Sequence, residues 1–228
     1  MTDSNPTFKQ KLIRATVVLT IICLASGGIL GTLFALAKDT IEQKQKKVFN
    51  DTLKTALGDF DEKEAVGSYK EGTRPQDKVW AIHRDSTTRY AGMGEAQGYQ
   101  STVRVLVSVE VEGKNKPVGD NPEILRVAVL PTQETPGLGE NIHKVEKDVS
   151  LWAALTGAES KVGEKRPSFQ AQFSGLTLSD IPKNPGEGLG EVKPVTGATI
   201  TSTAVVRATR RALERVVEKT QKAYGVGE

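Results

Sequence analysis

The stretch TVRVLVSVEV, Thr102 to Val111, carries a valine at every second position. Successive side chains of a β-strand point to opposite faces of a sheet, so all of these valines fall on one face. This strict alternation predicts a strand that buries one face against a core. The valines concerned are Val103, Val105, Val107, Val109 and Val111.

Further elements are predicted on the C-terminal side of this strand. The turn-rich residues 112–122 lead to EILRVAVL, Glu123 to Leu130, which predicts a second strand paired antiparallel with the first. A shorter strand is expected in FQAQFSG, Phe169 to Gly175. The last segment predicts an amphipathic helix whose arginines form a solvated face or, alternatively, a patch for a partner. Its apolar stripe consists of Val205, Ala208, Ala212, Leu213, Val216 and Val217.

The N-terminal side contains the longest uncharged run of the chain, ATVVLTIICLASGGILGTLFALA, residues 15–37. At about 1.5 Å per residue, a helix of this length crosses a hydrocarbon core of about 30 Å. We therefore expect residues 1–14 to be a short cytoplasmic N-terminus and residues 15–37 to be an uncleaved transmembrane helix. The alternative is a secretory signal peptide cleaved at ALA, residues 35–37, but its apolar core would be unusually long.

Residues 38–60 continue the anchor with apolar positions at helical spacing, which predicts an amphipathic stalk helix that packs on the following domain. The apolar positions are Ile41, Val48, Phe49, Leu53, Ala56 and Leu57. Residues 61–228 are then expected to form one extracytoplasmic domain. The predicted fold class is α+β, with a small antiparallel or mixed sheet flanked by helices and one N-terminal transmembrane helix.

Composition excludes several classes of function. The net charge is +3 and the acids nearly balance the bases, so nothing predicts a nucleic-acid partner. The single cysteine, Cys23, cannot form a disulfide within the chain or a cysteine-based zinc site. His83 and His143 have no other ligand-type residues at metal spacing, so no metal site is expected.

Two short motifs carry candidate chemistry. TGATITS, Thr196 to Ser202, runs into the start of the last helix, where unpaired N–H groups and the helix dipole favour a phosphate. Gly197 would let the backbone approach such a group. A plain helix cap by Thr201 or Ser202 explains the same hydroxyls. ETPGLGE, Glu134 to Glu140, predicts a rigid turn whose glycines let a flat ring approach the backbone.

TGATITS resembles the flavinylation motif of the FMN-binding domain family, which is shared by the G subunit of Rnf-type complexes and the C subunit of Na⁺-translocating NADH:quinone reductases. ETPGLGE and GYQ, Gly98 to Gln100, also resemble this family, so the resemblance covers most of the chain. It implies that FMN is joined to the Thr199 hydroxyl through a phosphoester. Lys193 departs from the family pattern, which has an acidic residue there; Glu191 lies close by. The cofactor-binding residues implied are Thr196, Gly197, Ala198, Thr199, Thr201 and Ser202, together with Glu134, Thr135, Pro136, Gly137, Leu138 and Gly139.

The resemblance further implies a membrane-anchored electron carrier that is not catalytic alone. Its domain would lie on the periplasmic side of the cytoplasmic membrane, in a ferredoxin:NAD⁺ oxidoreductase that couples electron flow to Na⁺ or H⁺ transport. The implied partners are the other membrane subunits of an Rnf-type complex and a flavin transferase that attaches the FMN. Two alternatives stay open: the C subunit of the quinone reductase, and an anchored flavin-binding sensory module without electron transfer.

Overall fold

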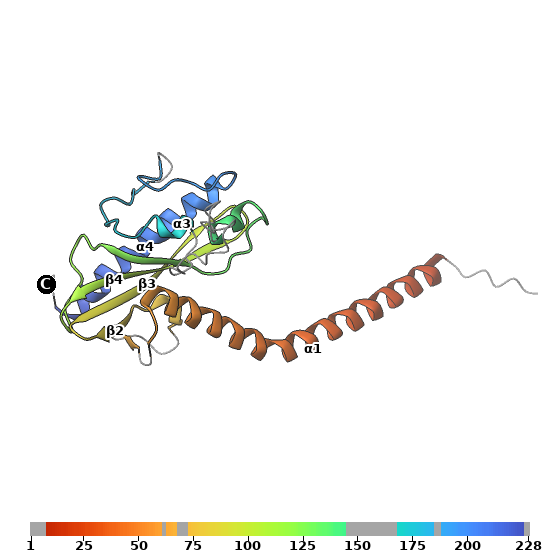
Figure 1. Ribbon diagram of the computed structural model, residues 1–228. Coiled ribbons are helices and arrows are strands. Elements are labelled where there is room, and N and C mark those ends of the chain that lie inside the picture. The colour runs from red at the N-terminus through yellow and green to blue at the C-terminus, as the bar shows by residue number, and fades with distance from the viewer. Residues whose placement is uncertain (1–7, 61–62, 68–72, 145–167, 185–187, 226–228) are drawn as a thin grey trace, which may run out of the picture. The chain divides into compact units, whose positions relative to one another are not determined.

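The computed structural model describes residues 8–60, 63–67, 73–144, 168–184 and 188–225 (Figure 1). The chain divides into two compact units, residues 1–48 and 49–228. Within the described residues the elements are α1 (Phe8–Leu57), β1 (Glu64–Ala65), η1 (Pro75–Asp77), β2 (Trp80–Arg84), β3 (Thr87–Gln97), β4 (Thr102–Glu112), β5 (Ile124–Val129), η2 (Gly139–His143), α3 (Ser168–Ala171) and α4 (Thr199–Ala223).

The described strands form a five-stranded antiparallel sheet in the order β1-β2-β3-β4-β5. The two strands predicted over 102–111 and 123–130 are confirmed as β4 and β5, and the α+β class is confirmed with them. Each connection joins neighbouring strands, so the sheet is a meander. β3 and β4 are its longest strands and pair along their full length, from Thr87 opposite Glu112 to Gln97 opposite Thr102. The tight turn at their end, residues 98–101, forms one wall of the cavity described below.

Helix α4 covers the face of the sheet that carries the β4 valines (Figure 1). Val103, Val105, Val107 and Val109 are buried in one cluster with the predicted apolar stripe of α4. The helix backbone comes very close to β3, because a Cβ built on Gly94 would lie 1.9 Å from the carbonyl oxygen of Ala208. Only glycine permits this approach, so β3 contains glycine where a helix-covered strand would otherwise carry larger side chains.

The other face of the sheet is covered by the last turns of α1. Phe49, Leu53, Ala56 and Leu57 pack there against Ile82, Ala91, Met93, Leu106 and Ala128. The helix-terminal carbonyls of α1 find donors on the sheet: Arg126 binds the oxygen of Thr55, Ser108 that of Ala56, and Arg89 that of Leu57. These bonds satisfy carbonyls that a helix end leaves unpaired, and the arginines also complement the negative end of the helix dipole.

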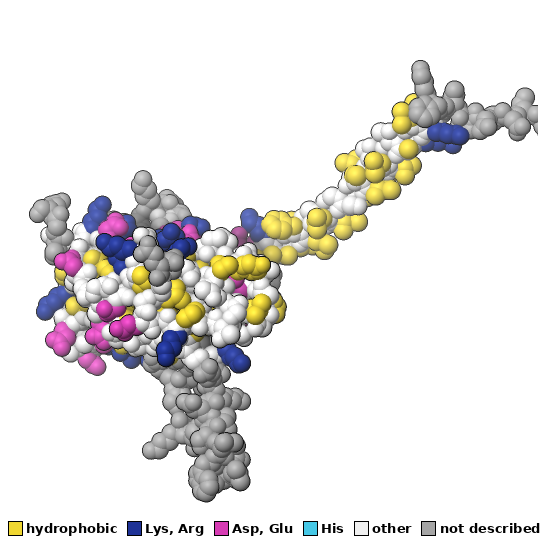
Figure 2. All heavy atoms as spheres, turned by 90° about the horizontal axis from the view of Figure 1, so that it is seen from above, with side chains coloured by type: hydrophobic (Ala, Val, Ile, Leu, Met, Phe, Trp, Pro, Cys, Tyr) yellow, Lys and Arg dark blue, Asp and Glu magenta, His cyan; other side chains and the backbone are white. Residues whose placement is uncertain are grey.

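Helix α1 runs without interruption through the apolar stretch 15–37 and ends at Leu57 rather than at residue 60. Gly58 ends it in a left-handed conformation, with φ of +88°. The segment Gln10–Leu57 contains a window long and apolar enough to cross a membrane. Its hydrophobic side chains are exposed along the whole apolar stretch, as Figure 2 shows. Ile41 and Val48, expected to pack on the domain, are exposed as well, and the packed part begins at Phe49.

One expectation about an individual segment is wrong, and a second is incomplete. Residues 169–175 form no strand but a short helix, α3, followed by turns, because Phe169 and Phe173 lie one helical turn apart and pack edge to face at 5.7 Å. The arginines of α4 are not a purely solvated face. Arg211 and Arg215 donate to the carbonyl oxygens of Glu95 and Met93 on β3, beyond the point where β2 pairs with it.

Candidate functional site

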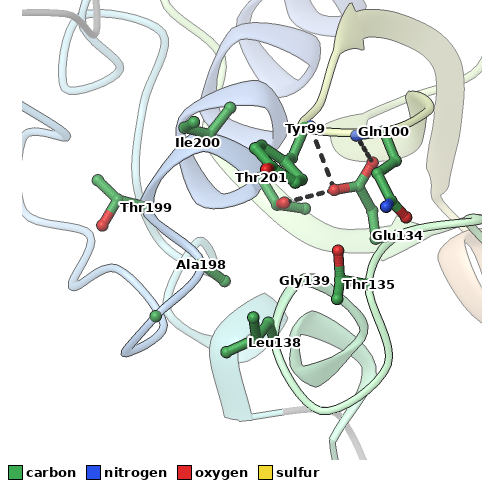
Figure 3. A pocket seen from close by; sticks show the side chains of 11 residues that line it. Tyr99, Gln100, Glu134, Thr135, Leu138, Gly139, Ala198, Thr199, Ile200 and Thr201 are labelled. Carbon is green, nitrogen blue, oxygen red and sulfur yellow. Dashed lines mark hydrogen bonds between the residues drawn. The ribbon is translucent and has the colours of Figure 1, made fainter.

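Three segments that are distant in the sequence meet around a cavity of about 610 Å³ (Figure 3). The turn between β3 and β4 contributes Tyr99 and Gln100. The loop that leads into η2 contributes Glu134, Thr135, Leu138 and Gly139. The start of α4 contributes the run from Gly197 to Thr201. The volume lies in the range of about 300–1,000 Å³ that is usual for small-molecule and cofactor sites.

Eight of the residues implied by the family resemblance line this cavity, and they come from both motifs. They are Glu134, Thr135, Leu138, Gly139, Gly197, Ala198, Thr199 and Thr201. Thr196, Ser202, Pro136 and Gly137 do not line it. Three further residues line the cavity. They are Ile200, which was not in the expected set, and Tyr99 and Gln100, which belong to the GYQ segment.

The first turn of α4 contradicts the alternative explanation of these hydroxyls, a helix cap by Thr201 or Ser202. The helix begins at Thr199 and its N-cap is Ala198, whose side chain makes no capping hydrogen bond. Thr201 and Ser202 therefore lie inside the first turn. The Ser202 hydroxyl accepts a hydrogen bond from the N–H of Val195 at 3.0 Å, and the Thr201 hydroxyl donates to Glu134. No side chain of the described residues caps the helix start, so its first N–H groups are available to an anion.

Thr199 is exposed at this helix start. Figure 3 shows its side chain on the outer side of the turn, pointing away from the Glu134 cluster. In the part of the chain that the structure describes, its hydroxyl has no hydrogen-bond partner. Gly197 precedes it with φ of +76°, and a Cβ at Gly197 would lie 2.9 Å from Leu138 Cδ2. The backbone on the N-terminal side of Thr199 therefore takes a path that favours glycine.

Glu134 lies at the centre of the three segments and is only 5% exposed. One carboxylate oxygen accepts hydrogen bonds from Thr201 Oγ1 at 2.6 Å and from the N–H of Tyr99 at 3.2 Å. The other accepts from the N–H of Gln100 at 3.2 Å and from the N–H and the hydroxyl of Ser101 at 2.8 and 2.9 Å. Burial raises the pKa of Glu134, but these hydrogen bonds outweigh burial and hold its pKa below the ordinary value.

The rim of the cavity is apolar. In the described part of residues 49–228, the large hydrophobic side chains that remain exposed are Tyr99 at 65%, Leu138 at 47% and Ile200 at 55%, and all three line this cavity. The wall also contains a buried hydroxyl, Thr135 Oγ1, which has no hydrogen-bond partner in the described part of the chain. A concave site with an apolar rim, a few polar groups and an open helix start suits a flat ring that carries a phosphate.

The sequence profile of the FMN-binding domain family matches residues 98–214, which is more than half of the chain. The chain belongs to the FMN-binding domain family. The matched range contains all three segments of the cavity, from the β3–β4 turn to the first turns of α4. Lys193 and Glu191 lie within the range but are exposed and do not line the cavity.

Relatives of full length extend the similarity beyond the matched range. The chain is 27% identical to the G subunit of the proton-translocating ferredoxin:NAD(+) oxidoreductase complex of Clostridium ljungdahlii, over 91% of this chain and 93% of the relative. It is 24% identical to the G subunit of the ion-translocating oxidoreductase complex of Vibrio cholerae, over 91% of each chain. It is 27% identical to the corresponding protein of Cronobacter sakazakii, over 86% of each. The resemblance to G subunits of oxidoreductase complexes is thereby confirmed.

Proposed function

We propose that the chain is the membrane-anchored G subunit of an Rnf-type complex and carries FMN covalently, as a phosphoester of the Thr199 hydroxyl. The observation that carries the proposal is the position of Thr199 at the cavity. It is exposed, its hydroxyl has no partner among the described residues, and it begins a helix whose N-cap makes no side-chain hydrogen bond.

The residues around the cavity fit FMN in three respects. A phosphate on Thr199 would be held by the N–H groups of the first turn of α4, where the helix dipole favours negative charge. Gly197 and Ala198 keep large side chains away from it. The apolar rim of Tyr99, Leu138 and Ile200 offers surface for the isoalloxazine ring.

In the mechanism that we propose, the flavin supplies the redox chemistry and the chain supplies position and electrostatics. The Thr199 oxygen would carry the link. The start of α4 would hold the phosphate, and Leu138 with the backbone of Gly139 would offer surface to the ring. Thr196 and Ser202 would support the site without lining the cavity. The Ser202 hydroxyl accepts a hydrogen bond from the Val195 N–H and so fixes the stretch of chain that leads to Gly197. Pro136 and Gly137 shape the loop that carries Leu138.

The surrounding assembly follows from the relatives, which are named as subunits of ion-translocating oxidoreductase complexes. We infer that α1 anchors the chain in the cytoplasmic membrane through residues 15–37 and that residues 61–228 lie on the periplasmic side. Other membrane subunits of the complex would exchange electrons with the flavin, and a flavin transferase would attach it. A covalent link would prevent loss of the cofactor by dilution outside the cell. Electron flow would be coupled to transport of Na⁺ or H⁺. The names of the relatives favour this assembly over the quinone reductase and over a sensory module.

The proposal is tested by the intact mass of the chain after denaturation, purified from a host with an active flavin transferase. We expect an added mass equal to esterified FMN that is absent from a Thr199→Ala variant. Thr203→Ala is the matched control, because its hydroxyl lies one helical turn further on and bonds back to the Thr199 carbonyl. An unmodified wild-type chain, or an adduct that persists in Thr199→Ala, would contradict the assignment.

A further inference from the structure

Glu134 differs from the other residues that line the cavity, because its hydrogen-bonding capacity is already filled. A carboxylate has about four lone-pair sites. Five donors from the β3–β4 turn and from α4 occupy them, at 2.6 to 3.2 Å. No acceptor site remains for an atom of the flavin. Glu134 can therefore act on the cofactor in two ways: through its charge, and by holding the β3–β4 turn and the start of α4 in place.

The hydrogen bonds join all three walls of the cavity. Glu134 itself belongs to the loop that carries Leu138 and Gly139. Its carboxylate receives three consecutive backbone N–H groups of the turn, from Tyr99 to Ser101, and the hydroxyl of Thr201 in the first turn of α4. The loop cannot shift relative to the turn or to α4 without breaking hydrogen bonds to the ionised carboxylate. Such hydrogen bonds are stronger than those between neutral groups.

Within the described residues, the charge of this carboxylate is stabilised by dipoles. All five donors are neutral groups, and among the described residues no lysine, arginine or histidine forms an ion pair with Glu134. No cation of the described ranges therefore cancels the negative charge in the wall of the cavity. At 5% exposure it is also poorly screened by solvent.

We propose that Glu134 is the positioning residue of the flavin site and that its fixed negative charge lowers the reduction potential of the flavin. This inference rests on the proposed function. Reduction transfers two electrons from an external donor to the flavin, and protons come from solvent. Glu134 exchanges neither electrons nor protons, but electron density added to a ring beside it is disfavoured by Coulomb repulsion, which the burial of Glu134 leaves poorly screened.

The neutral hydrogen-bond donors partly compensate the charge of Glu134. Removing the charge and removing one donor should therefore shift the reduction potential in opposite directions. Glu134→Gln removes the charge and raises the potential. Thr201→Val keeps the charge, preserves the shape of the side chain and removes the shortest of the five hydrogen bonds, so the charge is less compensated and the potential falls. A residue that served only as a structural support would give shifts of the same sign in both variants, toward the potential of free FMN.

The experiment is a reductive titration with dithionite and a reference dye, performed on the full chain in detergent after intact mass has verified the covalent flavin. For Glu134→Gln we expect at least a tenfold change in the ratio of reduced to oxidised flavin at a given potential, toward reduced flavin. This corresponds to about 30 mV upward for a two-electron couple. For Thr201→Val we expect a downward shift. Ser174→Ala, an exposed hydroxyl that bonds to Leu125, is the control and should leave the potential unchanged.

Each outcome decides the inference. An unchanged potential in Glu134→Gln, or shifts of the same sign in both variants, would overturn it. If Glu134→Gln does not fold, Thr201→Val alone decides, and an unchanged or raised potential overturns the inference. If intact mass shows no FMN adduct on the wild-type chain, the proposed function is refuted before the titration is performed. The inference about Glu134 is then refuted as well.

Discussion

At the residue scale, Glu134 connects the cavity to acid stability. Its folded pKa is held below the ordinary value of 4.5, so its hydrogen bonds stabilise the domain fully above that pH. The contribution is lost as the pH falls through the lowered folded pKa. We expect Glu134→Gln to lower the free energy of unfolding by roughly 2–3 kcal/mol at neutral pH, and this difference to shrink below about pH 4.5.

Thermal unfolding of the wild type and Glu134→Gln between about pH 3 and 7 measures this difference. Glu112→Gln is the control, because its exposed side chain on β4 should give a small difference. A gap between the wild type and Glu134→Gln that stays constant or widens toward acid would show that the carboxylate is not ionised in the folded domain.

Individual site residues differed in how far the sequence predicted them. Thr199, Gly197 and Ala198 belong to one contiguous motif, so the motif alone makes them candidates, and the structure places them at the cavity. Ile200 carries no pattern that distinguishes it from a core residue, and only the structure shows that it is 55% exposed at the rim. Glu134 was expected to border a ring. Its five hydrogen bonds depend on two other segments that meet it only in the fold.

At the element scale, the contact between α4 and β3 depends on Gly94. A Cβ at this position would lie 1.9 Å from the Ala208 carbonyl oxygen and 2.7 Å from the Ala212 backbone nitrogen, so the helix would have to move. We expect Gly94→Ala to lower the free energy of unfolding by about 3 kcal/mol or more. Because α4 carries Thr199 and Thr201, the proposed function predicts that the same shift reduces the fraction of chains that receive FMN.

Chemical denaturation and intact mass measure these two effects. The matched control is Gly119→Ala: nothing lies within 4 Å of a Cβ at this position, and its backbone is not left-handed. This substitution should be neutral or slightly stabilising, since it reduces the freedom of the unfolded chain. Equal stability of the two variants would mean that the helix adjusts without cost.

The elements that the sequence predicted well are those with one unambiguous period. β4 alternates strictly and α4 keeps one apolar stripe, and both were found as expected. β3 was not predicted, because the glycines that allow α4 to pack closely on it interrupt the alternation of apolar and polar residues. The strand predicted over Phe169 to Gly175 was wrong, because Phe169 and Phe173, four residues apart, satisfy both a strand period and a helical turn.

At the scale of the whole molecule, the boundary of the globular unit lies inside helix α1. The unit begins at Phe49, whereas the sequence predicted a domain boundary at residue 61. The helical pattern of residues 38–60 is continuous, so the sequence offers no signal for the change from exposed to packed helix. Side-chain burial marks that change: Val48 is exposed, while Leu53, Ala56 and Leu57 are fully buried.

Two fragments test this boundary. Residues 45–228 retain the last turns of α1, so we expect this fragment to be soluble without detergent and to unfold cooperatively. Residues 58–228 lack Phe49, Leu53 and Leu57, whose burial contributes about 1.5–3 kcal/mol each. That loss is comparable to the total stability of an ordinary domain, about 5–15 kcal/mol.

The shorter fragment also leaves Ser108 and Arg89 without the carbonyls that they bind at the end of α1, and exposes Met93 and Leu106 to water. It should therefore aggregate or bind an apolar dye, and it should not show a cooperative transition. Size-exclusion chromatography and thermal unfolding of the two fragments measure this directly. A monomeric, cooperative 58–228 fragment would place the whole of α1 outside the globular unit, and the helix would then be a tether rather than part of the fold.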